Sequence, residues 1–247
     1  MRRVRRKSLE DPVQRDLDQR QQEANRKHAA GALHATEEWK AARRAATVRA
    51  VHATLRSMMG DRERCMYCLD SHGSDIEHFW PKTPYPERMF QWLNLLLCCT
   101  ECGRFKGDEF PLSNGLPLLV DPTVEEPWEH LDFDTDTGNV VAKFDAQTGA
   151  WSPKGEKTVE VLQLDRREAL SAGYQQTFHR LSRMVENFLA EGSADMTQLV
   201  QSLRGADDHG LLGWCVTGNG RNVLPFRNLW ERHPEVRQAC ADAVNTA

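Results

Sequence analysis

The sequence predicts an α+β fold that is mostly helical, with a small zinc-bound unit ahead of its midpoint. Three observations lead to this prediction. Apolar residues recur at helical spacing in several long segments, turn sequences flank one short β-rich stretch, and four cysteines form two Cys-x-x-Cys pairs. The chain has 247 residues and is 40% hydrophobic, which is enough for a sizeable core. We expect three segments, residues 1–60, 61–122 and 123–247.

The N-terminal segment, residues 1–60, is predicted to be helical and basic. Residues 12–35 are polar and suit either an exposed helix or a flexible arm. From Trp39 onward, apolar side chains recur every three or four residues, which indicates one amphipathic helix, and Gly60 is well placed to end it. The segment holds 14 Lys and Arg against 7 Asp and Glu. This excess suits either contact with phosphate or a solvated helical face.

The C-terminal segment, residues 123–247, is predicted to be mainly helical with a small β-ribbon near 137–151. Two glycine-containing turn sequences there flank a run of β-branched and aromatic residues. The strongest amphipathic pattern covers residues 165–191, and a shorter helix is expected from Met196. Glycines and prolines beyond it predict an irregular tail before one last short helix.

Composition excludes several classes of protein. No apolar run is long enough to cross a bilayer, and no apolar stretch follows the basic start Met1–Lys7, so we expect neither a membrane protein nor a secretory signal. The seven cysteines are an odd number, and four of them have metal-ligand spacing. This usage favours a reducing compartment, the cytoplasm, over a disulfide framework. The net charge of −4 argues against a simple nucleic-acid-binding protein.

The two cysteine pairs predict one structural zinc site. Cys65 and Cys68 form the first pair, and Cys99 and Cys102 form the second. Two intervening residues let both sulfurs of a turn reach one ion at about 2.3 Å. Four thiolates close the coordination sphere, so this zinc is expected to be structural. Cys98 is an alternative to Cys99, although its place at the end of an apolar run favours core packing.

A Glu77–His78 dipeptide lies between the two pairs. We expect a strand that runs into a turn here, because Pro81 soon follows and disfavours helix. A carboxylate suits Mg²⁺ or Mn²⁺, and a neutral imidazole can take a proton from water near pH 7. Together they suit metal-assisted phosphodiester hydrolysis. The alternative is a buried core histidine beside a surface acid.

The motifs of residues 65–111 resemble a known family. They read Cys-x-x-Cys, Ile-Glu-His-Phe-x-Pro-Lys, Trp-x-Asn-Leu-Leu-Leu-x-Cys and Cys-x-x-Cys-x-x-x-Lys-Gly-Asp-x-Phe-Pro. This pattern is similar to that of the HNH endonuclease family of the zinc-knuckle type, and within it to the PtuB-like nuclease subunits of Septu-type antiphage defence systems. The resemblance implies a ββα-metal unit, in which two strands and a helix surround one divalent ion.

The resemblance also implies roles for individual residues. His78 would be the general base that activates water, and Glu77 would bind a catalytic Mg²⁺ or Mn²⁺. Asn94 would brace the loop and orient the histidine. Lys82 and Lys106 would contact phosphate, and each is also compatible with a plain surface charge.

One position departs from the family pattern. Gly103 directly follows Cys102, where the family usually has an Asn or His that binds the catalytic metal. Three alternatives follow: Glu77 holds the ion with phosphate and water, Asp108 reaches it, or the site is weakened.

The resemblance implies a metal-dependent DNA endonuclease, the effector of an antiphage defence complex regulated by an ATPase partner. Residues 61–111 hold 6 Lys and Arg against 9 Asp and Glu, so DNA affinity should come from the basic segment, a homodimer or the partner. Two alternatives remain open at this point. One is an RNA-cleaving HNH nuclease, and the other is a zinc-stapled binding scaffold without catalysis.

Overall fold

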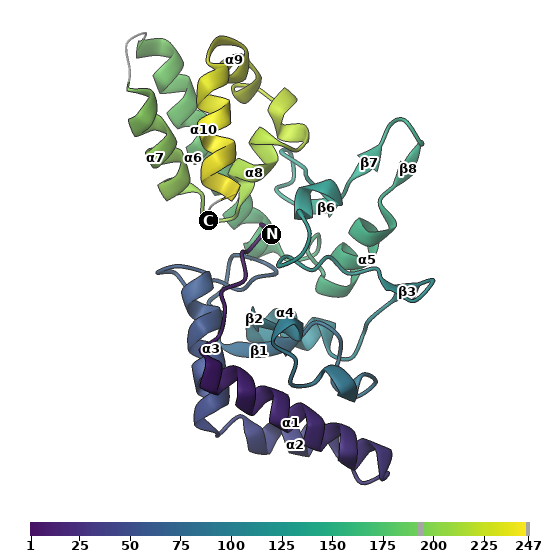
Figure 1. Ribbon diagram of the computed structural model, residues 1–247. Helices are drawn as coiled ribbons and strands as arrows, with labels where there is room; N and C mark the ends of the chain where they lie inside the picture. The colour runs from purple at the N-terminus through teal and green to yellow at the C-terminus, as the bar shows by residue number, and fades with distance from the viewer. Residues whose placement is uncertain (192–194, 246–247) are drawn as a thin grey trace. The chain divides into compact units, whose positions relative to one another are not determined.

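The computed structural model describes residues 1–191 and 195–245. By its internal contacts, the chain forms two compact units. The first unit contains residues 6–66 and 71–112, and the second contains residues 1–5, 67–70 and 113–247. Helices predominate, and the strands within the described ranges form four two-stranded sheets (Figure 1). The prediction of a mostly helical α+β fold is therefore confirmed. No helix within these ranges is long and apolar enough to cross a bilayer.

The first unit begins with three helices, α1 (Asp11–Ala29), α2 (Ala35–Ala42) and α3 (Ala46–Met58). For the polar residues 12–35, the sequence is compatible with either an exposed helix or a flexible arm. In the structure these residues are helical as far as Ala29 in α1, which buries Leu17, Gln21 and Ala24 on one face. The single helix expected from Trp39 is wrong in one respect. A turn at residues 43–45 separates α2 from α3, and no glycine or proline marks it.

Part of the basic N-terminal start is used for structure within this unit. The Arg6 guanidinium donates to the carbonyls of Trp92 (3.1 Å), Leu93 (3.0 Å) and Leu95 (2.6 Å). The Trp92 indole N–H donates in return to the Lys7 carbonyl at 3.0 Å. These charge-assisted bonds hold the start of the chain against the loop that leads into strand β2.

A β-hairpin and a helix form the centre of this unit. Strand β1 (Asp75–His78) pairs antiparallel with β2 (Leu95–Cys98), with His78 opposite Leu95. Two 3₁₀ turns, η1 (Pro86–Arg88) and η2 (Trp92–Asn94), lie in the loop between the strands. Helix α4 (Thr100–Lys106) follows β2 directly. Every residue of β2 is buried, as its continuous apolar sequence leads one to expect.

Short strands come next along the chain, and all but the first residue of them belong to the second unit. They are β3 (Leu112–Ser113), β4 (Leu116–Pro117), β5 (Leu131–Phe133), β6 (Val140–Ala142), β7 (Phe144–Asp145) and β8 (Ala150–Trp151), with a 3₁₀ turn η3 (Pro127–Glu129). Strands β7 and β8 pair within the stretch predicted to form a ribbon. Strand β6 instead pairs with β5, upstream of that stretch. Helix α5 (Pro153–Leu162) then packs on β6, with Ser152 as its N-cap.

The rest of the second unit is helical. Its elements are α6 (Glu168–Glu191), α7 (Met196–Ala206), α8 (Leu211–Val216), η4 (Asn219–Asn222), α9 (Phe226–Arg232) and α10 (Pro234–Asn245). The prediction of an irregular tail after α7 is wrong. Most of residues 211–245 are helical, and the glycines and prolines lie mainly between or at the ends of short helices. Helices α6, α7 and α10 pack side by side (Figure 1).

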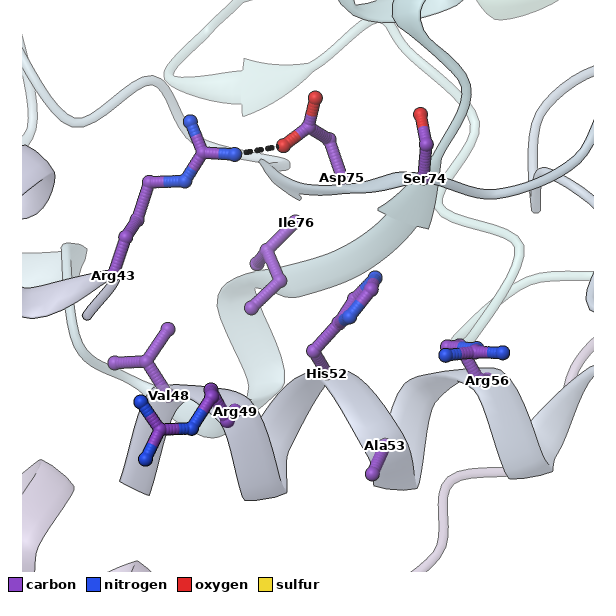
Figure 2. A pocket seen from close by; sticks show the side chains of 9 residues that line it. All are labelled: Arg43, Val48, Arg49, His52, Ala53, Arg56, Ser74, Asp75 and Ile76. Carbon is purple, nitrogen blue, oxygen red and sulfur yellow. Dashed lines mark hydrogen bonds and ion pairs between the residues drawn. The ribbon is translucent and has the colours of Figure 1, made fainter. Parts of the chain in front are cut away.

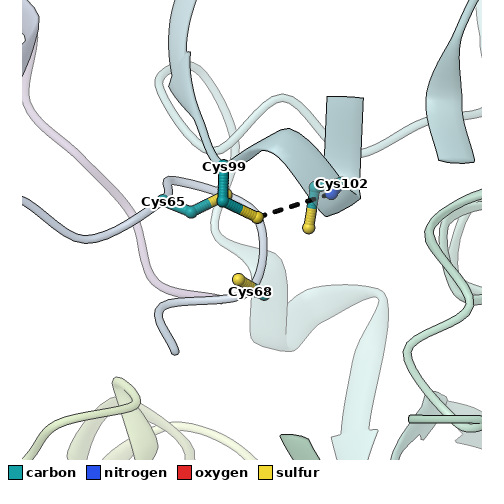
Figure 3. A group of neighbouring side chains, drawn as sticks. All are labelled: Cys65, Cys68, Cys99 and Cys102. Atoms are coloured by element: carbon teal, nitrogen blue, oxygen red, sulfur yellow. Dashed lines mark hydrogen bonds between the residues drawn. The ribbon is translucent and has the colours of Figure 1, made fainter. Parts of the chain in front are cut away.

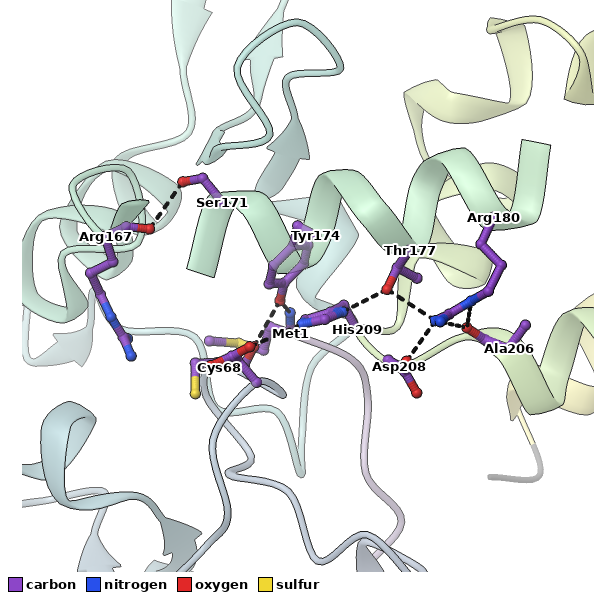
Figure 4. A network of polar contacts seen from close by, with 11 residues as sticks. Met1, Cys68, Arg167, Ser171, Tyr174, Thr177, Arg180, Ala206, Asp208 and His209 are labelled. Carbon is purple, nitrogen blue, oxygen red and sulfur yellow. Dashed lines mark hydrogen bonds and ion pairs between the residues drawn. The ribbon is translucent and has the colours of Figure 1, made fainter. Parts of the chain in front are cut away.

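A buried polar network joins separate segments of the second unit (Figure 4). The amino group of Met1 donates to the Tyr174 hydroxyl at 2.5 Å, and that hydroxyl lies 3.1 Å from the Cys68 carbonyl. His209 contacts the Tyr174 ring and lies 2.8 Å from the Thr177 hydroxyl through Nδ1. The network therefore ties the short segments 1–5 and 67–70 to helix α6.

Candidate metal centre and active site

Four buried cysteines converge on one point (Figure 3). The sulfur atoms of Cys65, Cys68, Cys99 and Cys102 all lie within 4.8 Å of one another. Bonds of about 2.3 Å to a tetrahedral zinc place the sulfurs roughly 3.8 Å apart, so this donor set fits zinc after a small contraction. Cys98 is not in the group. Within the described ranges, no other three His, Cys, Asp or Glu side chains are grouped in this way.

Local backbone bonds explain why the cysteines meet. The Met66 amide donates to the Leu97 carbonyl at 2.9 Å, which brings the first cysteine turn against the end of β2. Cys99 is the N-cap of α4, and its sulfur accepts the N–H of Cys102 at 3.4 Å. The second pair therefore lies on the first turn of a helix, where two intervening residues bring both sulfurs to one side.

His78 ends strand β1 and faces a pocket, although only 4% of it is exposed. Its Nε2 lies 3.0 Å from the Met89 carbonyl oxygen. A carbonyl only accepts hydrogen bonds, so Nε2 must carry the proton and Nδ1 keeps its lone pair. The ring of Trp39 packs edge-on against the imidazole, with centroids 4.3 Å apart. The histidine is thus held in one tautomer, with Nδ1 as its basic nitrogen.

The surroundings keep this imidazole neutral. Burial, followed by the positive charge of Lys82, lowers the pKa of His78 to about 3. The Met89 carbonyl opposes this, and Lys106 adds a smaller lowering effect. At neutral pH the ring is therefore uncharged, which is the form that can accept a proton from water.

Asn94 ties together the loop that follows the histidine. Its Oδ1 accepts the Trp80 amide at 2.7 Å, and its Nδ2 donates to the carbonyls of Trp80 and Arg88, both at 3.0 Å. Only 4% of Asn94 is exposed. The bracing role expected for Asn94 remains a prediction, and these bonds support it.

Gln21 holds the same loop from helix α1, a role that no sequence pattern indicated. Its Nε2 donates to the Pro86 carbonyl at 2.9 Å, and its Oε1 accepts the Phe90 amide at 2.6 Å. These two bonds flank Met89, whose carbonyl orients the histidine. A glutamine in a polar helix is ordinary, so only its burial, with 8% exposed, distinguishes it.

Glu77 and Lys106 form an ion pair beside the histidine. Lys106 has no exposed surface, and its Nζ lies 2.9 Å from Glu77 Oε1 and 2.7 Å from the His78 carbonyl. Burial raises the pKa of Glu77, and the charge and hydrogen bond of Lys106 oppose that rise. Contact between Lys106 and phosphate stays a prediction, and it requires this pair to open. The buried lysine instead joins the carboxylate to the backbone of the predicted general base.

The pocket in front of these residues has a volume of about 500 Å³. His78, Glu77, Gly103 and Asp108 line it together with the cations Lys82, Arg104 and Arg43. Arg104 and Arg43 were not singled out from the sequence. Their place in the pocket depends on how α2 and α4 pack against β1, for which residue spacing gave no signal.

The residues of the pocket suit a divalent ion that a bound phosphate would help to hold. They suit less well an ion held by protein ligands alone. Glu77 Oε1 is paired with Lys106, so only Oε2 is left. A Cβ atom at Gly103 would lie 3.4 Å from that Oε2, which places position 103 where a second protein ligand would face Glu77. Asp108 lines the pocket, and Asp75 is paired with Arg43. Magnesium sites with one or two carboxylates plus substrate phosphate are common.

Restoring a side-chain ligand at position 103 is expected to tighten metal binding. The carboxamide of a Gly103→Asn variant would face Glu77 Oε2, and the added oxygen ligand should lower the Kd for Mn²⁺ about tenfold or more, roughly 1.4 kcal/mol. Titration of zinc-loaded protein with Mn²⁺, followed by electron paramagnetic resonance, measures this directly. Gly103→Ala adds the Cβ without a ligand and should bind Mn²⁺ like the wild type. Equal affinities for the Asn and Ala variants would contradict the expectation.

The fold and the site define a mostly helical protein in which the turn at residues 65–68 and the start of α4 bring four cysteines together, and the central hairpin presents a buried histidine and carboxylate to a cationic pocket. No family model matches the chain. The chain is similar to Septu protein PtuB of Bacillus thuringiensis, with 31% identity over 137 residues that cover 51% of this chain and 48% of that protein. It is also similar to Septu protein PtuB of Bacillus mycoides (strain KBAB4), with 32% identity over 136 residues that cover 42% of this chain and 44% of that protein. The chain thus aligns with about half the length of these curated relatives.

Proposed function

We propose that this chain is a metal-dependent HNH-type endonuclease that hydrolyses phosphodiester bonds of DNA as part of an antiphage defence complex. One observation carries the proposal. His78 is fixed by the Met89 carbonyl as the tautomer whose Nδ1 is basic, and it lies next to Glu77 at a pocket lined by Lys82 and Arg104. The similarity to two Septu PtuB proteins supports the defence role.

In this proposal the residues of the pocket divide the work between binding and proton transfer. Lys82 and Arg104 hold the phosphate, and His78 Nδ1 takes the proton from the attacking water. The negative phosphate offsets the lysine charges that lower the pKa of the imidazole, so substrate binding makes His78 a stronger base. A divalent ion near Glu77, when bound, would stabilise the charge that develops on the leaving oxygen.

Cleavage of a supercoiled plasmid tests the proposal. The wild-type protein with Mg²⁺ or Mn²⁺ should nick the plasmid, and His78→Ala should be slower by about 10² to 10⁴-fold, the usual contribution of a general base. Nicked and linear products separate on an agarose gel. Circular dichroism of each variant shows whether it is folded.

His179→Ala is the matched control, because His179 is an exposed histidine on α6 of the second unit. It should cut like the wild type. Cleavage by His78→Ala at the wild-type rate would contradict the proposed role of the histidine. Parallel digestion of single-stranded RNA distinguishes DNA from RNA as the substrate, since metal-assisted hydrolysis does not need a 2′-hydroxyl.

An ATPase partner belongs to the same proposal. Residues 61–111 carry more acidic than basic side chains, so this region alone should hold DNA weakly, and a partner would supply affinity and control. Co-expression with the product of the neighbouring gene tests this. Isolation of a stable complex whose cleavage depends on ATP supports it, and full activity of the single chain contradicts it.

A second function, a zinc-stapled scaffold without catalysis, is favoured by two observations. Gly103 offers no ligand to a catalytic metal, and Lys106 already pairs with Glu77. This alternative predicts stoichiometric zinc, binding of nucleic acid, and no cleavage with any divalent ion. The plasmid experiment, run with and without the co-expressed partner, therefore separates the two functions.

A further inference from the structure

A second pocket lies beside the first, between helix α3 and strand β1 (Figure 2). Its volume is about 320 Å³. Arg49, His52 and Arg56 line it from α3, because residues three and four apart lie on one face of a helix. Arg43 reaches it from the turn after α2. We call this site the α3 arginine pocket.

The α3 arginine pocket carries unbalanced positive charge. Arg43 pairs with Asp75 and Arg56 pairs with Glu63. Arg49 is exposed and donates to the Arg44 carbonyl at 2.6 Å, and it lies within ion-pair distance of no carboxylate in residues 1–191 and 195–245. Three guanidinium groups therefore face two carboxylates, and Arg49 is available to an anion.

Two nitrogen atoms of this pocket also lack hydrogen-bond partners. They are His52 Nε2 and Arg56 Nε, which are buried and unpaired with respect to the described part of the chain. Both belong to residues that line the pocket. Unpaired buried polar groups are uncommon in folded proteins, and an anion with several oxygen atoms is the kind of ligand that satisfies them.

The α3 arginine pocket continues the pocket at His78. Both are lined by Arg43, Asp75 and Ile76, and Ile76 lies only two residues before His78 on β1. A strand rises about 3.3 Å per residue, and one strand of a DNA duplex carries a phosphate about every 3.4 Å of helix axis. Ile76 and His78 are therefore separated along β1 by roughly the rise of one to two nucleotides, so a strand held at His78 can pass into the α3 arginine pocket.

We propose that the α3 arginine pocket binds the phosphodiester backbone of the substrate strand, one or two nucleotides from the bond that reacts at His78. This inference rests on the proposed nuclease function and names the site that supplies affinity. It also explains how an acidic chain holds a polyanion, because the cations are concentrated next to the reacting bond.

Salt-dependent DNA binding tests this site without any cleavage. Zinc-loaded His78→Ala protein, with no other divalent metal, is titrated into fluorescein-labelled DNA of roughly 20 nucleotides, single-stranded and duplex, at several NaCl concentrations. Adding Arg49→Ala should weaken binding and reduce the slope of log K against log salt by about 0.7 for single strands or 0.9 for duplex. Arg49→Lys retains the charge and should preserve the slope. Arg26→Ala removes the same charge from the far end of α1, where Arg26 pairs with Glu23, and should leave the slope unchanged.

The outcomes separate this site from the proposed function. An unchanged slope for Arg49→Ala, or the same change for Arg26→Ala, overturns the phosphate subsite. Calorimetric titration with inorganic phosphate distinguishes a small-anion site from a backbone site. The proposal expects Arg49→Ala to lose DNA affinity, and it expects the protein with Arg49 in place to show no binding of phosphate at millimolar concentrations. Tight phosphate binding with unchanged DNA affinity also overturns it. DNA binding is measured here without any cleavage. If the wild-type protein proves inactive, that finding contradicts the nuclease function, and the binding measurements still test the phosphate subsite.

Discussion

Removal of zinc is expected to unfold the region around the hairpin and helix α4. A structural zinc contributes about 10–16 kcal/mol of apparent binding free energy, as much as or more than the total stability of a typical domain, about 5–15 kcal/mol. Cys102→Ala should therefore lose its zinc, and hydrogen exchange should show the amides of β1, β2 and α4 losing protection. Zinc content by mass spectrometry should fall from one atom per chain to less than one.

Cys98→Ala is the matched control, since Cys98 is buried next to Cys99 but lies outside the cluster. It should keep a full complement of zinc, with only the loss of stability that follows truncation of a small core side chain. If Cys98→Ala loses zinc while Cys99→Ala retains it, the ligand assignment is wrong. If chelation leaves the protection of the hairpin unchanged, zinc is not structural.

Replacement of Lys106 by Met is expected to destabilise the protein by about 3–5 kcal/mol. The substitution removes the partner of Glu77 and leaves a carboxylate that is only 17% exposed without its counter-charge. The His78 carbonyl also loses its hydrogen bond from Nζ. Urea denaturation of the zinc-loaded protein, followed by fluorescence, measures the change in the free energy of unfolding.

A double-mutant cycle distinguishes the ion pair from simple packing. Adding Glu77→Gln to Lys106→Met removes the buried charge and should restore a large part of the lost stability. Lys82→Met removes the same charge from a half-buried lysine with no ion pair in the described ranges, and it should change stability by less than about 1 kcal/mol. Additive effects of the two substitutions at 77 and 106 would contradict the proposed coupling.

The Glu77–Lys106 pair also changes how the departure at Gly103 is understood. From the sequence, the glycine appeared only as a missing metal ligand. The structure places the side chain of Lys106 on the same carboxylate that would receive the metal. The site therefore contains its own cation, and a divalent ion has to share or displace it. For this reason, measurement of Mn²⁺ affinity is more informative than measurement of cleavage alone.

Local features of the sequence predicted much of the candidate site. Two-residue spacing identified the four cysteines, which converge in the structure. The apolar run that ends at Cys98 indicated core packing, and its last four residues form the buried strand β2. These predictions succeed because turns, caps and ligand spacing depend on residues that are close in the chain.

Other features escaped prediction for the opposite reason. The break between α2 and α3 has no breaker residue, so the packing of two helices decides it, not propensity. Gln21 bonds to Pro86 and Phe90, which lie 65 and 69 positions further along the chain. A glutamine on a polar helix is ordinary, so nothing in its sequence context indicates these bonds. The helical C-terminal tail was missed because its helices are short and separated by glycine and proline.

The sequence by itself determined which four cysteines come together, the placement of Glu77 and His78 between them, and the predominance of helix. Only the tertiary structure decided which imidazole nitrogen is basic, where the charge of Lys106 goes, and which arginines gather beside β1. The first set follows from spacing along a few turns of chain. The second set depends on contacts such as those of Lys106 with Glu77 and of Arg43 with Asp75, about 30 residues apart, which no local pattern encodes.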